Sequence, residues 1–168
     1  MKEIEEKIKN IPGSTGKYYL TEPVHRASWV LNFDYRISDV FSARNRIQIN
    51  TYNRSAGSDI GYLAQQDIYA QFRNWKFSVC YALFDAASFD VRLYAYERDV
   101  WMSYSFPAYY GKGVRTYIQL QYRLNSRMDI WLRWANTTYA DRNWVGYGFE
   151  SIKGNSRNDL KIQLRVKL

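Results

Sequence analysis

The chain has 168 residues, a mass of 20.0 kDa and a formal net charge of +8, which suits one domain with a single core. Sixteen tyrosines, eight phenylalanines and six tryptophans make it 18% aromatic, which excludes a disordered or low-complexity sequence. The single cysteine, Cys80, excludes a disulfide framework. With only one histidine, His25, the chain also lacks the residues of most hydrolase active sites and most metalloenzyme sites. No stretch approaches the roughly 18 apolar residues of a transmembrane helix, and the mean hydropathy is −0.53.

Residues 1–26 differ from the rest of the chain. The first ten residues are rich in Lys and Glu, and their pattern breaks at the turn signal Pro12-Gly13. A signal peptide would need a continuous apolar stretch in this place. We therefore expect a charged N-terminal segment or linker over residues 1–26, without an export signal, followed by one β domain over residues 27–168.

From Ser28 onward, apolar and polar residues alternate with a period of two, which predicts β-strands. The pattern is most regular at the C-terminus, where Leu160, Ile162 and Leu164 alternate with lysine, glutamine and arginine. Glycines and prolines fall almost entirely between the alternating runs. The alternation predicts about eight or nine long strands, over residues 29–37, 44–51, 62–73, 75–83, 89–95, 102–106, 114–124, 128–134 and 160–168.

The expected connections between these strands differ in length. Short links are expected at residues 39–41, 73–75 and 125–127, with a further reversal near residues 97–99. Longer links are expected at residues 54–60, 110–113 and 140–158. Short turns at one end and long loops at the other are typical of outer-membrane barrels. We predict an all-β fold, an antiparallel up-and-down meander that forms a transmembrane β-barrel or part of one.

Alternation by itself fits two environments. In a soluble sheet the apolar face is the core, whereas in a membrane barrel it contacts lipid and the polar face lines the interior. Long uniform strands, a polar face that mixes charged and amide residues, and aromatic residues near strand ends favour the membrane. The aromatic residues expected at the membrane interface are Trp29, Trp75, Phe89, Phe106, Tyr122 and Trp134.

Five motifs, in this order along the chain, carry a resemblance: residues 82–85 (ALFD), 92–97 (RLYAYE), 106–113 (FPAYYGKG), 129–135 (DIWLRWA) and 152–155 (IKGN). Over roughly residues 24–168 the chain resembles the C-terminal barrel region of Bacteroidetes helix-hairpin-helix (ComEA-like) outer-membrane proteins. The resemblance implies a place in the cell outer membrane, with lipid and other outer-membrane proteins as candidate partners.

This chain has no counterpart of the family's helix-hairpin-helix segment, signal sequence or earlier strands. The family's DNA-binding label belongs to the missing segment and does not carry over to this chain. An odd number of strands also suits a fragment of a larger barrel better than a complete one.

We expect no catalytic site, no cofactor and no metal. His25 lies beside Arg26 and has no acidic partner in a recognisable motif, so a hydrolase arrangement is not indicated. Carboxylates such as Asp85 and Asp90 lie in or near expected loops, where solvated charge is the default. Cys80 is expected to be a packed thiol rather than a nucleophile.

The basic polar face is the remaining chemical signal. Inside a barrel its cations would pair with acids such as Asp34, Asp67 and Asp129 to give a salt-bridged interior, or would form an anion-selecting lumen. The favoured function is a non-enzymatic outer-membrane barrel with a structural or transport-related role. The alternative is a soluble β domain that binds anionic ligands or nucleic acid through its arginines and tyrosines. The candidate anion-facing residues are Arg36, Arg44, Arg46, Arg92, Arg115, Arg123, Arg133, Lys161, Arg165 and Lys167.

Overall fold

The computed structural model describes residues 2–8, 20–55, 57–146 and 148–167, and within them it is all-β. Two 3-10 turns, η1 (Phe89–Val91) and η2 (Gly148–Glu150), are the helical elements of this part of the chain. Five strands are short: β1 (Lys2–Ile8), β6 (Leu93–Tyr94), β7 (Ala108–Tyr109), β10 (Trp144–Val145) and β11 (Ile152–Lys153). The long strands are β2 (Leu20–Arg36), β3 (Phe41–Arg54), β4 (Gly57–Phe72), β5 (Trp75–Ala86), β8 (Gly111–Arg123), β9 (Met128–Tyr139) and β12 (Ser156–Val166).

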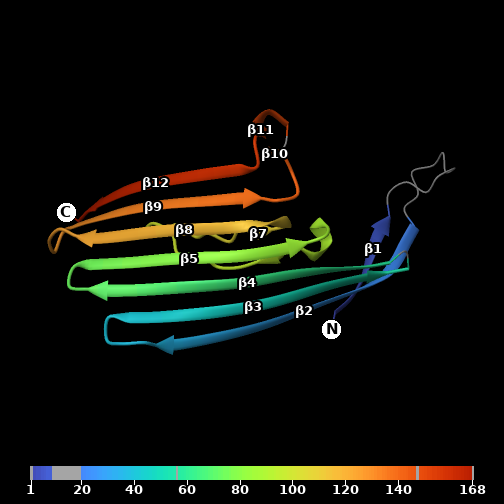
Figure 1. Cartoon of the computed structure of the whole chain (residues 1–168), viewed down its shortest axis with the longest axis horizontal. Helices are drawn as coiled ribbons and strands as arrows, with labels where there is room; N and C mark the ends of the chain where they lie inside the picture. Colours follow the sequence, from blue (N-terminus) through green and yellow to red (C-terminus); the bar gives the residue numbers. More distant parts are fainter. Residues whose placement is uncertain (1, 9–19, 56, 147, 168) are drawn as a thin grey trace.

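The long strands form one antiparallel sheet in the order β2-β3-β4-β5-β8-β9-β12, and β1 pairs with residues 20–26 of β2. Each long strand pairs with its predecessor along the chain, so the expected antiparallel meander is confirmed (Figure 1). β2 runs without a break across the boundary between residues 26 and 27, so the sheet begins inside the segment expected to be a linker. Residues 9–19 of that segment lie outside the described residues.

Within the described residues the sheet is open, and no strand pairing closes it into a barrel. In the described part of the chain, β12 pairs only with β9, and residues 27–36 of β2 pair only with β3. Because six antiparallel pairings separate β2 from β12, these two edge strands run in the same direction. Direct pairing between them would therefore be parallel, unlike every other pairing in the sheet.

The connections at one end are short, as expected: residues 37–40, 73–74 and 124–127 join successive strands. We call this the short-turn end. At the opposite end, the link between β9 and β12 is long and contains β10, η2 and β11. The prediction of a long link over residues 54–60 is wrong, because β3 continues to Arg54 and β4 starts at Gly57.

The strands expected over residues 89–95 and 102–106 are absent from the main sheet. Residues 87–110, which we call the inserted hairpin, instead leave the long-loop end of β5 and double back before β8. Their two arms pair through β6 and β7 and through a bridge between Glu97 and Ser105, and the reversal includes Met102 at φ 57°. The alternation in this segment is real, because Val91, Leu93 and Ala95 are buried while Tyr94 and Tyr96 are exposed. The period of two therefore predicted extended backbone correctly in this segment. It did not reveal that the segment packs on a face of the sheet instead of joining the sheet as strands.

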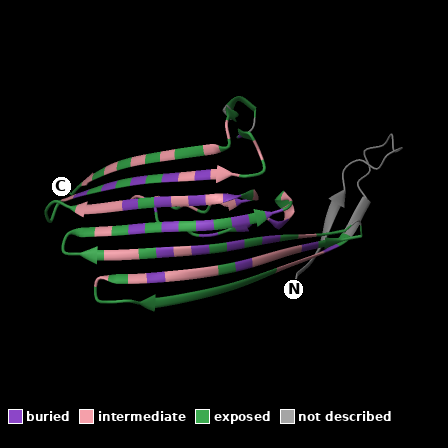
Figure 2. Cartoon of the chain, in the orientation of Figure 1, coloured by how far each residue is buried: buried purple, intermediate pink, exposed green. Residues whose placement is uncertain are grey.

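Buried and exposed residues alternate along the central strands (Figure 2), so the two faces of the sheet differ in burial. The inner face carries the buried members of β4, β5, β8 and β9 and is covered by the inserted hairpin. A small apolar cluster fills the space between them and includes Leu63, Ala82, Phe84, Val91 and Leu93. Gly61 on β4 is needed there, because a Cβ at this position would lie 2.4 Å from the carbonyl oxygen of Val91. The opposite, outer face has nothing packed on it in the described part of the chain.

Candidate functional site

The outer face is apolar and exposed, whereas the inner face is polar and buried. Leu31, Phe33 and Ile162 on the outer face are 52%, 53% and 71% exposed. On the inner face, Asp67 and Arg133 are each 1% exposed. A water-soluble sheet has the reverse arrangement, with apolar side chains inside and charges outside. Contiguous exposed apolar surface of this kind marks contact with another protein or with lipid.

The tryptophan and tyrosine residues on the outer face of the long strands fall on two lines. One line, toward the long-loop end, consists of Trp29, Tyr62, Tyr81 and Trp134 on β2, β4, β5 and β9. The other, toward the short-turn end, consists of Tyr35, Trp75 and Tyr122 on β2, β5 and β8. Tryptophan and tyrosine concentrate at the two interfaces of a bilayer, because each ring is apolar and carries one polar group.

Both lines cross the strands obliquely. The pairing register connects Trp134 on β9 with Tyr35 on β2, which lies six residues beyond Trp29. At about 3.4 Å per residue, the first line therefore shifts by about 20 Å across five strand spacings of about 4.8 Å each. These dimensions correspond to a strand tilt of about 40°, within the range of about 35–45° found in membrane barrels. The oblique lines would lie level if the strands were tilted in a bilayer by this angle.

The length of the apolar stretch on β5 supports the same geometry. Outward residues are apolar from Trp75 to Leu83 and end at the charged Asp85, which pairs with Lys112 at 3.1 Å. This stretch extends about 27 Å along the strand, or about 21 Å when tilted, close to the apolar band of about 25 Å in membrane barrels. Two amides interrupt the band: Asn45 and Gln66 are cross-strand neighbours.

The aromatic residues expected at the interface occupy three different environments. Trp75 and Tyr122 are in ring contact on the outer face near the short-turn end, with ring centroids 4.1 Å apart and planes inclined by 32°. Trp29 and Trp134 are also on the outer face, but each lies within its strand rather than at the end. Phe89 and Phe106 do not lie on long strands: Phe89 is in η1 and Phe106 is in the returning arm of the inserted hairpin.

Glu97 of the inserted hairpin is the centre of a buried ionic network on the inner face. Its side chain is fully buried between two arginines that project from neighbouring strands, Arg115 of β8 and Arg133 of β9. Arg115 donates from Nε to Oε1 at 2.6 Å and from Nη2 to Oε2 at 2.9 Å, and Arg133 donates to Oε2. Tyr109 also donates its hydroxyl to Oε1 at 2.8 Å. Ion pairing and hydrogen bonding together compensate the desolvation of these charges.

Tyr109 and Asp99 strengthen the anchoring of the inserted hairpin. Burial, aided by the charge of Glu97, raises the pKa of the Tyr109 phenol well above its ordinary value, so the phenol keeps the proton that it donates. Asp99 accepts hydrogen bonds from Lys161 Nζ at 2.5 Å, from the Val100 amide at 2.8 Å and from Ser103 at 3.1 Å. Burial acts to raise the pKa of Asp99, but the hydrogen bonds from Lys161 and the Val100 amide and the charges of Arg133 and Lys161 outweigh it and hold the pKa below its usual range.

Most of the ten predicted anion-facing residues are paired with acids. Arg44 pairs with Asp34 at 2.6 Å and Arg36 with Asp39 at 3.1 Å, both near the short-turn end. Asp129 pairs with Arg165 and with Arg123, the latter at 3.5 Å. With Arg115 and Arg133 on Glu97 and Lys161 on Asp99, the inner face of the sheet is largely salt-bridged.

Three of the ten have no ion pair with a described acid: Arg46, Arg92 and Lys167. Arg46 donates to Gln48 at 2.8 Å and to the Tyr94 carbonyl at 3.2 Å. Arg92 lies on the inserted hairpin rather than on a strand of the sheet, and it donates to the Phe89 carbonyl and the Tyr94 hydroxyl. Four residues that line or anchor this face were not predicted from the sequence: Glu97, Asp99, Lys76 and Arg98. The signal for Glu97 was a lone acid at an inward position of an alternating run.

Comparison with protein-family models, curated proteins and solved structures finds no match. Within the described ranges, no helix is long and apolar enough to cross a membrane. The same residues contain no cluster of three or more His, Cys, Asp or Glu side chains that could hold a metal ion.

Proposed function

We propose that this chain forms part of the wall of an outer-membrane β-barrel, with a structural or transport-related role and no enzymatic activity. The outer face contacts lipid, and the inner face lines an interior that the inserted hairpin partly fills. The resemblance of residues 24–168 to the barrel region of Bacteroidetes outer-membrane proteins suggests the same environment.

The observation that carries this proposal is the reversed burial of the two faces. Large apolar side chains of every long strand are exposed, including Leu31, Ile47, Phe77, Leu132 and Ile162. At about 25 cal/mol per Å² of apolar surface, leaving such a face in water would forfeit much of the stabilisation available to a domain of this size. Lipid removes that cost, and the oblique aromatic lines match the tilt that strands adopt in it.

A barrel of this kind needs further strands. In lipid, unpaired backbone N–H and C=O groups at an open sheet edge cost several kcal/mol each, by order of magnitude, so an edge must be paired or covered. The described sheet has two such edges, β12 and residues 27–36 of β2, which run in the same direction. An odd number of additional strands, from elsewhere in the protein or from a partner chain, would close the barrel with antiparallel pairings alone.

The alternative, a soluble domain that binds nucleic acid through its basic face, has less support. The inserted hairpin occupies the centre of that face, and acids already pair with Arg115, Arg123, Arg133 and Arg165. Stacking on bases needs accessible aromatic rings beside free cations. Tyr117 is fully buried on the inner face, so it offers no such ring, and the exposed Tyr94 and Tyr96 lie on the inserted hairpin rather than on the sheet.

The proposal is tested by the solvent that the folded chain requires. We expect the purified chain to be monodisperse only with detergent or lipid, and to migrate differently on gels before and after heating. A chain that is folded and monodisperse without detergent, with the same mobility before and after heating, would contradict the proposal. Salt-dependent oligonucleotide binding that the exposed-site variant Arg123→Glu weakens would instead support the soluble alternative.

A further inference from the structure

Two cavities lie side by side on the inner face near the short-turn end. The first, of about 680 Å³, lies over the ends of β2, β3 and β4. The second, of about 570 Å³, lies over β5, β8 and β9. Lys76 of β5 and Arg98 of the inserted hairpin line both cavities and so stand at their junction.

The first cavity carries more positive than negative charge. It contains Arg36, Arg44, Lys76 and Arg98 but only two carboxylates, Asp34 and Asp39. Those two are already used, because Asp34 pairs with Arg44 and Asp39 with Arg36. Two positive charges therefore remain, on Lys76 and Arg98, and neither makes an ion pair with an acid in the described part of the chain.

Arg98 is held in place by contacts that leave its charge uncompensated. Its backbone N–H donates to the Tyr117 hydroxyl at 3.3 Å, and its carbonyl accepts from Arg133 Nε at 3.0 Å. Its guanidinium lies over the ring of Tyr69, 3.9 Å from the centroid, so the ring fixes its plane without neutralising it. The adjacent acid, Asp99, is occupied by Lys161 and by the Val100 amide.

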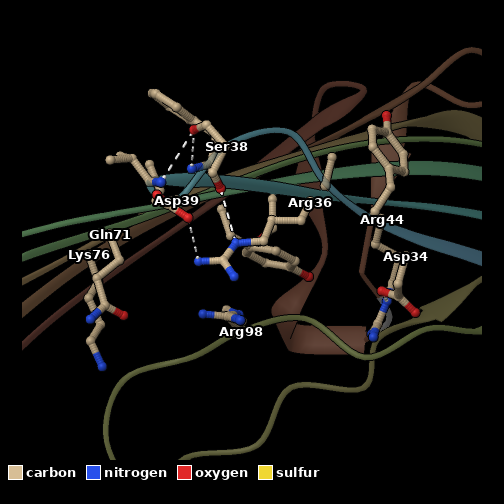
Figure 3. Close-up of a pocket in the computed structure, with 15 residues that line it drawn as sticks. Asp34, Arg36, Ser38, Asp39, Arg44, Gln71, Lys76 and Arg98 are labelled. Atoms are coloured by element: carbon tan, nitrogen blue, oxygen red, sulfur yellow. Dashed lines mark hydrogen bonds and ion pairs between the residues drawn. The ribbon is translucent and has the colours of Figure 1, made fainter.

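Figure 3 shows how these cations are arranged. The guanidinium groups of Arg36 and Arg98 point into the same central space, and Lys76 lies at one side of it. An arginine fork together with a lysine ammonium matches the geometry of a phosphate group. We propose that the first cavity binds a phosphate group, with Arg98 and Lys76 as its ligands.

The phosphate could belong to a small soluble molecule or to a lipid headgroup. The cavity lies on the inner face, opposite the apolar outer face, which favours a soluble phosphate. The inference does not rest on the proposed membrane location, because only the inner face and the inserted hairpin carry it. Phosphate binding can therefore be disproved while the proposed membrane location stands, and the membrane location can be disproved while phosphate binding stands.

The test is calorimetric titration of the full chain in an uncharged maltoside detergent with inorganic phosphate, pyrophosphate and phosphatidic acid in mixed micelles. Lys76→Gln with Arg98→Gln should weaken binding by roughly 10- to 100-fold, since each lost hydrogen bond to a charged group costs on the order of tenfold. Arg127→Gln with Lys153→Gln removes the same charge from exposed sites outside both cavities and should leave binding unchanged. Lys76→Arg should retain binding.

Protection of the buried Cys80 thiol from a small reagent checks that each variant keeps its fold. Binding of phosphate or pyrophosphate that the cavity variant loses would support a soluble ligand, and loss confined to phosphatidic acid would assign the site to a headgroup. Three results would overturn the proposal: no binding by the unmodified chain, equal binding by the folded cavity variant, or an equal loss in the control variant.

Discussion

Replacement of Glu97 by Gln should release the inserted hairpin from the sheet. The carboxylate is fully buried and accepts hydrogen bonds from two arginines, with Arg115 8% and Arg133 1% exposed. An amide of the same size keeps the volume but presents an NH₂ group to one of the guanidinium groups and removes the negative charge. Breaking a buried ion pair by removing one partner costs about 3–5 kcal/mol.

The lower end of that range applies here because two other acids lie close enough to compensate part of the positive charge left on Arg115 and Arg133. Asp99 lies 3.7 Å from Arg133, and Asp159 lies 3.7 Å from Arg115. A loss of about 3 kcal/mol in the docking free energy corresponds to a population of the open state raised by roughly 100-fold. The opening is expected to be local, because the long strands keep their own backbone pairing.

Cys80 offers a direct assay, because it is the single cysteine, is fully buried and lies on the inner face beneath the inserted hairpin. Its labelling rate with a small uncharged thiol reagent should rise by roughly 100-fold in Glu97→Gln if opening limits access. Asp39→Asn, which removes a carboxylate with a 98% exposed side chain, should change the rate by less than about threefold. Equal rates in the two variants would refute the anchoring role of Glu97.

Three further predictions concern the docking of the inserted hairpin and the outer face. Gly61→Ala places a Cβ 2.4 Å from the Val91 carbonyl and should cost about 1–3 kcal/mol, seen as faster Cys80 labelling, whereas Ala64→Val on the outer face should not. Folding lowers the pKa of Asp99, so the ionised carboxylate stabilises the folded state at pH values above the unfolded pKa of about 3.9. This stabilisation is lost as the pH falls below the folded pKa. The stability difference between the unmodified chain and Asp99→Asn, measured by denaturant at pH 7 and pH 2, should therefore shrink in acid. Leu132→Arg within the apolar band should destabilise folding into vesicles by about 2–4 kcal/mol, and Thr138→Arg beyond the line of aromatic residues by about 1 kcal/mol or less.

Much of the sheet could be predicted because its residues alternate for a physical reason that acts locally. β12 and β9 present apolar and polar side chains to opposite environments, so Ile162 and Lys161 identify the strand and its two faces without knowledge of its neighbours. The short turns were also accessible, because each contains asparagine, serine or aspartate between two alternating runs.

The inserted hairpin could not be predicted from the same pattern. Leu93 and Ala95 alternate with Tyr94 and Tyr96 as a sheet strand would, yet they are buried against the sheet rather than within it. The positions of Trp29 and Trp134 were unexpected for a related reason. Aromatic residues were expected at strand ends, but with oblique strands a level interface crosses each strand at a different residue, which only the register reveals.

Two tryptophans on β9 can show directly whether the outer face contacts lipid. Trp134 is 39% exposed on the outer face, and Trp131 is 4% exposed on the inner face of the same strand. Single-tryptophan variants, with the other five tryptophans replaced by Phe, are reconstituted into vesicles with brominated acyl chains. If the outer face contacts lipid, the brominated lipid will quench Trp134 fluorescence strongly and Trp131 fluorescence little. Quenching of Trp134 by aqueous acrylamide but not by brominated lipid would contradict this contact.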